Sequence, residues 1–221
     1  MVTQYKPILF STKMVQAILE GRKTQTRRLH GLDEIKKNPN DWTFYYFSKD
    51  DKRTFAHFRN QEDNKIKSIF GTSPYQIGDI LWVRETWQTT WNENKKSWDI
   101  IYKADGGYWI DDDGIMKWKP SIYMPKKAAR IFLEVTNVRV ERLQDITEED
   151  AIAEGIERVS IAPFVHRFKN YLCNNKFIGP KESFKTLWMK INGEDSWNAN
   201  PWVWVYEFKQ VHHPKGFLNE H

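Results

Sequence analysis

Residues 20–28 read Glu-Gly-Arg-Lys-Thr-Gln-Thr-Arg-Arg and place four cations and two threonine hydroxyls directly after a predicted helix end. The cations are Arg22, Lys23, Arg27 and Arg28. A cluster of ammonium and guanidinium groups is suited to phosphate or another anion. A threonine hydroxyl, in turn, is a nucleophile only when a neighbour accepts its proton. The stretch is therefore either a solvated basic turn or part of a binding site.

The net charge of the chain is concentrated near its amino end. The first 30 residues hold six basic side chains and one acidic side chain, and this excess of +5 equals the net charge of the whole chain. The remaining residues hold 28 basic and 28 acidic side chains. This distribution favours a local site for a small anionic or polar ligand over a long basic groove.

Local signals predict the elements that lead into this stretch. Residues 7–10 form a short apolar strand, and Ser11 is a good N-cap for a helix over 12–20. Gly21 supplies the left-handed residue that ends this helix. The predicted order is therefore a strand, a short helix and a sharp turn.

The conformation after the turn decides which groups meet. If residues 23–28 are extended, Lys23 and Arg27 lie on one side of the strand and Thr26 lies on the other. A turn before Gln25 would instead bring Lys23 and Thr26 together.

Further along the chain, strands outnumber helices. We therefore expect an α+β fold, built as a small β-barrel with short helices at its rim. The length of 221 residues fits one domain, with an insertion at 30–74 that carries two short strands. We expect strands at 80–87, 98–104, 131–140 and 201–211, helices at 148–155 and 180–193, and a rim loop at 192–201. Thr147 is the expected N-cap of the first of these helices, with Asp150 in a capping-box arrangement.

Composition excludes several classes of protein. No run of about 18 uncharged apolar residues is present, and the amino terminus lacks the features of a signal peptide, so we expect a cytoplasmic protein without a membrane partner. Cys173 is the single cysteine, and the histidines lack zinc-ligand spacing. Walker A and Rossmann glycine motifs are absent from the sequence. We therefore expect no metal and no cofactor.

Aromatic and polar side chains extend the candidate site. Eleven tryptophans are present, and those near strand ends, such as Trp87 and Trp202, could stack on a base or could fill the core. Asn198, in the predicted rim loop, could contact a base edge. The candidate substrate- or nucleic-acid-binding residues are Arg22, Arg27, Arg28, Trp82, Glu85, Trp87, Trp197, Asn198 and Trp202.

Three segments together resemble the ASCH family, a branch of the PUA-like fold. Residues Gly21–Arg28 resemble its G-x-K-x-x-x-x-R signature, 77–83 its G-D-x-L-x-V strand, and 143–156 its L-x-x-L-T-x-x-x-A-x-x-E helix. Glu154 stands at the acidic position of that helix. The start and end of the chain are most similar to phage and prophage members, and 30–74 and 157–180 have no counterpart in these motifs.

The resemblance implies an activity. Many family members have glutamate at the position of Thr26, and the threonine agrees with a bacterial branch that is similar to N4-acetylcytidine amidohydrolases. It implies a catalytic triad in which Thr26 is the nucleophile, Lys23 the base and Glu154 a proton shuttle, acting on N4-acylcytidine or a related base. Burial or neighbouring arginines would lower the pKa of Lys23 for this role.

Two other functions are compatible with the same residues. The first is a non-catalytic module that binds RNA or DNA in the same cleft, and the second is a metal-independent ribonuclease. In each case the expected partner is a nucleoside or RNA, with DNA as an alternative. Arg28 could hold a phosphate or a base carbonyl bidentately, or could pair with Asp79 or Glu85.

Overall fold

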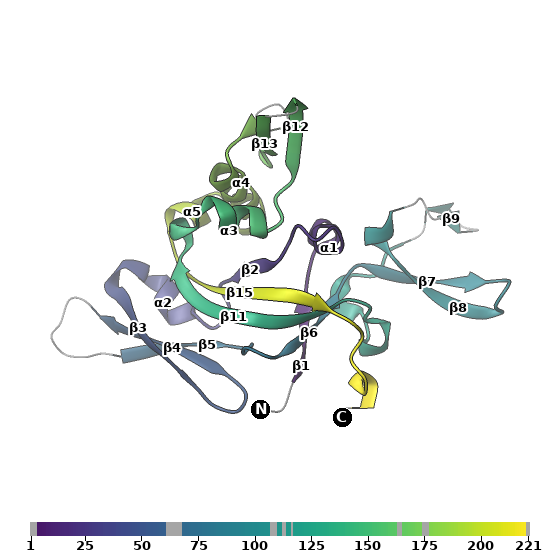
Figure 1. Ribbon diagram of the computed structural model, residues 1–221, viewed down its shortest axis with the longest axis horizontal. Helices are drawn as coiled ribbons and strands as arrows, with labels where there is room; N and C mark the ends of the chain where they lie inside the picture. Colours follow the sequence, from purple (N-terminus) through teal and green to yellow (C-terminus); the bar gives the residue numbers. More distant parts are fainter. Residues whose placement is uncertain are drawn as a thin grey trace. The chain divides into compact units, whose positions relative to one another are not determined.

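The computed structural model describes most of the chain and has a mixed α+β fold in which strands predominate (Figure 1). The residues described are 4–60, 68–106, 110–111, 114–115, 117–162, 165–173 and 177–219. The chain forms two compact units. Unit 1 contains Arg22–Gly78 and Val135–Phe208, and unit 2 contains Val2–Gly21, Asp79–Glu134 and Lys209–His221.

The main sheet has the strand order β1-β6-β11-β15-β2. Strands β11 (Phe132–Arg142) and β15 (Trp202–Val211) run through both units. Within the residues that the structure describes, β1 and β2 are the free ends of this order, so the described pairings give an open sheet and not a closed barrel. The α+β prediction is confirmed, and the barrel remains a prediction.

In unit 1, β2 (Gln25–Arg28) pairs antiparallel with β15. Thr26 is opposite Tyr206, and Arg27 is opposite Val205. Because residues that oppose each other across a strand pair share a face, Thr26 lies on the Tyr206 face and Arg27 on the Val205 face. The extended alternative for this segment is therefore the one observed.

Helices cover the Val205 face of β15. Val203 and Val205 pack with apolar residues of α3 (Glu148–Ala153), α4 (Pro180–Asn192) and α5 (Asp195–Asn198). The hydroxyl of Thr147 caps α3 by accepting from the Asp150 amide at 3.1 Å. The predicted helices at 148–155 and 180–193 are confirmed. The prediction of a loop at 192–201 is wrong in part, since α5 forms a single turn there.

The Tyr206 face of β15 packs against the 30–74 segment. Trp204 and Tyr206 form a core cluster with α2 (Asp33–Lys37) and with a three-stranded antiparallel sheet. This sheet has the order β3-β4-β5, where β3 is Trp42–Lys49, β4 is Thr54–Asn60 and β5 is Ser68–Ser73. Two short strands were expected here, and the third strand was missed. A second small sheet of unit 1 contains β12 (Arg158–Ala162), β13 (Val165–Lys169) and β14 (Phe177–Ile178).

Unit 2 begins with the predicted strand, helix and turn. Strand β1 (Tyr5–Leu9) pairs in parallel with β6 (Ile80–Arg84), which in turn pairs antiparallel with the start of β11. The Ser11 hydroxyl accepts from the Met14 amide at the start of α1 (Thr12–Leu19), and Gly21, after the end of this helix, has a φ of 72°.

The predicted strand at 80–87 is divided in two, because β6 ends at Arg84 and β7 (Trp87–Asn92) begins at Trp87. Strand β7 forms a hairpin with β8 (Ser97–Tyr102). The described part of unit 2 also contains the short strands β9 (Ile110–Asp111) and β10 (Gly114–Ile115), which pair with each other.

None of the helices that the structure describes is both long and apolar enough to cross a membrane.

Candidate functional site

The amine of Lys23 contacts Glu154, although 131 residues separate them in the chain. Lys23 Nζ donates to Glu154 Oε2 at 2.9 Å, to the Glu154 carbonyl at 2.9 Å and to the Gln25 carbonyl at 2.8 Å. A backbone bridge between Lys23 and Glu154 and a bond from the Thr24 amide to the Ala153 carbonyl hold the two segments together. The start of β2 is therefore fixed to the end of α3.

The environment of Lys23 acts on its proton in two opposite ways. Burial lowers the pKa of Lys23, and the charges of Arg28 and Arg27 lower it further, whereas Glu154 raises it, and the net shift is downward. Three acceptors surround Nζ, which matches the number of N–H donors of an ammonium group. The protonated amine is therefore well held, while its proton is easier to remove than that of a lysine in water.

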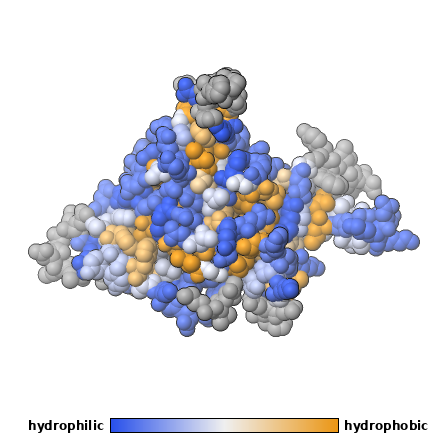
Figure 2. Space-filling model, in the orientation of Figure 1, coloured by the Kyte–Doolittle hydropathy of each residue, from blue (hydrophilic) through white to orange (hydrophobic). Residues whose placement is uncertain are grey.

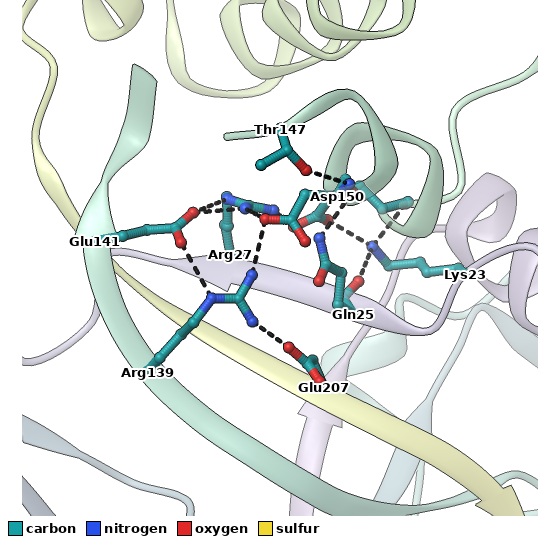
Figure 3. A network of polar contacts seen from close by, with 9 residues as sticks. Lys23, Gln25, Arg27, Arg139, Glu141, Thr147, Asp150 and Glu207 are labelled. Carbon is teal, nitrogen blue, oxygen red and sulfur yellow. Dashed lines mark hydrogen bonds and ion pairs between the residues drawn. The ribbon is translucent and has the colours of Figure 1, made fainter. Parts of the chain in front are cut away.

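Arg27 lies inside the protein, surrounded by carboxylates (Figure 3). Its Nη1 donates to Glu154 Oε1 at 3.1 Å, and its Nη2 donates to Asp150 Oδ2 at 2.8 Å and to Glu141 Oε1 at 2.5 Å. Only 5% of Arg27 is exposed. Arg27, a predicted substrate- or nucleic-acid-binding residue, therefore directs its donors at acidic side chains of its own chain.

A second arginine extends this network. Arg139 Nη2 donates to Asp150 Oδ2 at 2.8 Å, its Nε donates to Glu141 Oε2 at 3.1 Å, and its Nη1 contacts Glu207. Burial alone would raise the pKa of Asp150, but Arg27 and Arg139 lower it below the ordinary value. The Gln25 side-chain amide also donates to the Asp150 carbonyl at 2.7 Å.

The sequence interpretation missed most of this network. Arg139 and Glu141 are two residues apart on β11, and the period of two in a strand was the available signal that they share a side. Asp150 was noted only as part of a helix cap. Its carboxylate instead joins two arginines from two different strands.

Thr26 lies on the other face of β2. It is 2% exposed and stands opposite Tyr206, whose hydroxyl bonds to Ser73 Oγ at 2.8 Å. Burial raises the pKa of Tyr206 above that of a tyrosine in water. The Lys23 amine binds the carbonyl of the peptide group that joins Gln25 to Thr26, on the α3 side of β2, whereas the Thr26 side chain lies on the Tyr206 side.

Arg28 shares the face of Thr26, two residues further along β2. It is half-buried, and burial lowers the pKa of Arg28, although the side chains of Tyr75, Glu154 and Tyr206 partly offset the effect. Its charge acts on Lys23 as well. Arg28 therefore links the electrostatics of the Lys23–Glu154 pair to the face that carries the Thr26 hydroxyl.

Arg22 has a structural role in this part of the fold. Its Nη1 donates to the Gly155 carbonyl at 2.8 Å and contacts the Ile156 carbonyl at 3.5 Å. Carbonyl groups after a helix end attract a cation. Arg22 therefore stabilises the turn that follows Glu154.

The remaining predicted residues of unit 1 differ in exposure. Trp197 is buried and packs against Phe184 with ring centroids 6.4 Å apart, so it is a core residue rather than a free stacking surface. Trp202 is half-buried and donates from Nε1 to the Pro39 carbonyl at 3.2 Å. Asn198 is exposed at the end of α5.

The predicted residues of unit 2 form contacts within that unit. Glu85 is buried and receives two bonds from Arg130, at 2.8 and 3.0 Å, and burial raises the pKa of Glu85. Trp82 packs in the unit 2 core, and the Trp87 ring lies 4.8 Å from the Lys119 amine. Asp79 forms an ion pair with Lys6 at 2.7 Å.

A cavity of about 430 Å³ lies elsewhere in unit 1. Its lining is mostly apolar and does not include Lys23, Thr26 or Glu154. The lining residues are Phe47, Ser48, Lys49, Thr54, Gln76, Ile77 and Val138. Among the residues that the structure describes, no group of three or more His, Cys, Asp or Glu side chains is arranged to hold a metal ion.

Comparison of the chain with protein-family models, with curated proteins and with solved structures gave no match.

Proposed function

We propose that the protein is an amidohydrolase that removes the acyl group from N4-acylcytidine or a closely related modified base. The observation that carries the proposal is the buried contact of the Lys23 amine with the Glu154 carboxylate, immediately before the strand that carries Thr26. The proposal includes membership of the ASCH family and its PUA-like barrel. The motif residues Gly21, Lys23, Arg28 and Glu154 support that assignment.

In the proposed reaction, the Thr26 oxygen attacks the acyl carbonyl while neutral Lys23 takes the hydroxyl proton. The carbonyl π electrons move to oxygen, and the cation of Arg28 on the same strand face stabilises the resulting oxyanion. The C–N bond then breaks, and the Lys23 ammonium returns the proton to the exocyclic nitrogen of the base. Water hydrolyses the acyl-threonine ester, so that one amide and one water give one amine and one carboxylic acid.

The electrostatics of Lys23 fit this role. A base must be neutral at the moment of attack, and the pKa of Lys23 is lowered by burial and by Arg28 and Arg27. A neutral amine has two N–H donors and one lone pair. It can keep two of the three present acceptors, while Glu154 holds the side chain in place. The Thr26 side chain lies on the other face of β2, so the proposed reaction requires a local change at residues 24–26 that brings the hydroxyl to this lone pair.

The test is the release of cytidine and acetate from N4-acetylcytidine by the purified protein, measured by liquid chromatography and mass spectrometry. Thr26→Ala should abolish release, because it removes the nucleophile. Thr24→Ala is the matched control, since Thr24 is an exposed threonine two residues away, and it should retain activity. Wild-type protein that leaves N4-acetylcytidine intact across a wide pH range would refute the proposal.

One observation favours a second candidate, a module that binds a modified nucleoside or RNA without turnover. The three acceptors around Lys23 stabilise the protonated amine, and protonated lysine cannot act as a base. Binding of N4-acetylcytidine without release of acetate would select this alternative.

A further inference from the structure

The sheet of 30–74 has one face in the core and one face covered with aromatic rings. On β4, Ala56 and Phe58 are fully buried, whereas the alternate residues Phe55 and His57 point to the other face. The inner residues pack with Trp204 of β15. The outer rings are therefore not needed to fill the core of unit 1.

The strand register aligns these outer rings. His57 is opposite Tyr46 on β3 and opposite Phe70 on β5, so one ring from each strand forms a row across the sheet. The rings of Tyr46 and His57 are stacked, with centroids 4.2 Å apart and an interplanar angle of 5°. Phe55 adds a fourth ring, with its centroid 5.5 Å from that of Phe70. We call Tyr46, Phe55, His57 and Phe70 the aromatic row.

The aromatic row is accessible. Tyr46 is 46% exposed and Phe70 is 59% exposed. In the orientation drawn, apolar residues reach the surface where Figure 1 places β3 and β4 (Figure 2). A bond of 2.7 Å between Ser48 Oγ and His57 Nε2 fixes the central ring. Large rings held rigidly at a protein surface are typical of a binding surface.

Cations border the aromatic row. The guanidinium of Arg59 lies 3.2 Å from the centroid of Tyr45, and that of Arg53 lies 5.6 Å from the centroid of Phe55. Residues 42–60 hold four Lys and Arg side chains and two Asp side chains, so this segment is net positive. Rings that accept bases by stacking, together with cations that accept phosphates, are the combination that binds single-stranded nucleic acid.

We propose that the aromatic row binds a single-stranded segment of RNA by stacking two or three of its bases. The choice of RNA rests on the proposed function, since an acylated cytidine within a strand is a ribonucleotide. The stacking itself rests only on the geometry of the row and the sign of the neighbouring charge. This surface would give the 30–74 segment a function in substrate recognition.

The test measures binding of a fluorescent, unmodified, cytidine-rich RNA of 12 nucleotides by anisotropy. The Tyr46→Ala and Phe70→Ala variants are measured separately. Each should lower the affinity for the RNA by about 5- to 150-fold, the range for loss of one base–aromatic stack. Tyr46→Phe and Phe70→Tyr keep the rings and should bind within about twofold of wild type. Tyr123→Ala, which removes an exposed ring of unit 2, is the matched control and should bind normally.

Two further measurements test the contribution of phosphate contacts and the preference for RNA over DNA. Arg59→Gln should reduce the slope of log affinity against log salt, because one cation fewer contacts phosphate. DNA of the same sequence should bind more weakly than RNA. Equal or tighter binding of DNA would overturn the assignment to RNA.

A failure of RNA binding can be distinguished from a failure of the proposed amidohydrolase activity. The RNA in the binding assay carries no acyl group, and the turnover assay uses the free nucleoside. Tyr46→Ala should leave the turnover of free N4-acetylcytidine unchanged. RNA affinity that is unchanged in both alanine variants would refute the aromatic row as the binding surface. A wild-type dimer that Phe70→Ala converts to a monomer, with RNA affinity unchanged, would identify the face as a contact between two copies and would also refute the proposal.

Discussion

Lys23 and Arg27 bind opposite oxygens of one carboxylate. That carboxylate belongs to Glu154, whose Oε2 lies 2.9 Å from Lys23 Nζ and whose Oε1 lies 3.1 Å from Arg27 Nη1. Both cations flank Thr26 in the sequence, so a single acidic side chain from the end of α3 fixes the charges on both sides of the candidate nucleophile.

Glu154→Ala should destabilise the protein strongly, because it leaves two buried cations without their shared partner. The expected loss in the free energy of unfolding is about 3–5 kcal/mol, measured by urea denaturation. Glu34→Ala removes an exposed carboxylate that pairs with Lys37 and should change stability little. Equal effects of the two substitutions would contradict the buried network.

The pH dependence of turnover should report the pKa of Lys23. Since the neutral amine is the proposed base, kcat/KM should rise with pH and level off above the pKa of Lys23, which burial and then the neighbouring arginines hold below that of an ordinary lysine. Arg28→Gln removes one of the charges that lower this pKa and should move the rising limb to higher pH. Lys23→Arg should remove the activity, since guanidinium does not deprotonate in this range.

Stability should fall on acidification partly because of Asp150. Its pKa is lowered in the folded protein, so its contribution is fully present above the unfolded value of about 3.9 and is lost as the pH falls through the folded value. Asp150→Asn should be less stable at pH 7, and its stability should depend less on pH below about 4. Parallel pH curves for the variant and the wild type would show that Asp150 contributes no such linkage.

The two faces of the β3-β4-β5 sheet should respond differently to truncation. Phe58→Ala should cost about 3–5 kcal/mol, because it leaves a cavity beneath Trp204 and Tyr206. Phe70→Ala should change the free energy of unfolding by less than about 0.5 kcal/mol, since its ring is largely exposed. Thermal unfolding of both variants checks this, and a large loss for Phe70→Ala would mean that the outer face is packed.

Local features of this fold were readable from the sequence. The Ser11 cap, the left-handed Gly21 and the Thr147 cap depend on neighbours within four residues, and all three are confirmed. Strand β5 was missed because its residues alternate only weakly and its pairing with β4 is set by distant contacts. The closed barrel depends on contacts between remote strands, and the described pairings leave it unconfirmed.

Arg27 shows what a charge count leaves out of a site prediction. The count placed an excess of cations on residues 1–30 but carried no information on which acids meet them in three dimensions. Glu141 and Asp150 come from β11 and α3, more than 110 residues away, and take up the donors of Arg27. The contact of Lys23 with Glu154 was anticipated only through the family motif, because no local rule relates two residues at that separation.

The Lys23 amine also has a consequence for the edge of the main sheet. Strand β2 is the last strand in the order of the main sheet, so within the described part of the chain its outer edge is not covered by another strand. An uncovered edge carbonyl is a template for the strand of a second molecule. The Gln25 carbonyl is instead occupied by Lys23, so the same side chain that prepares the proposed chemistry also takes up a backbone acceptor that an added strand would need.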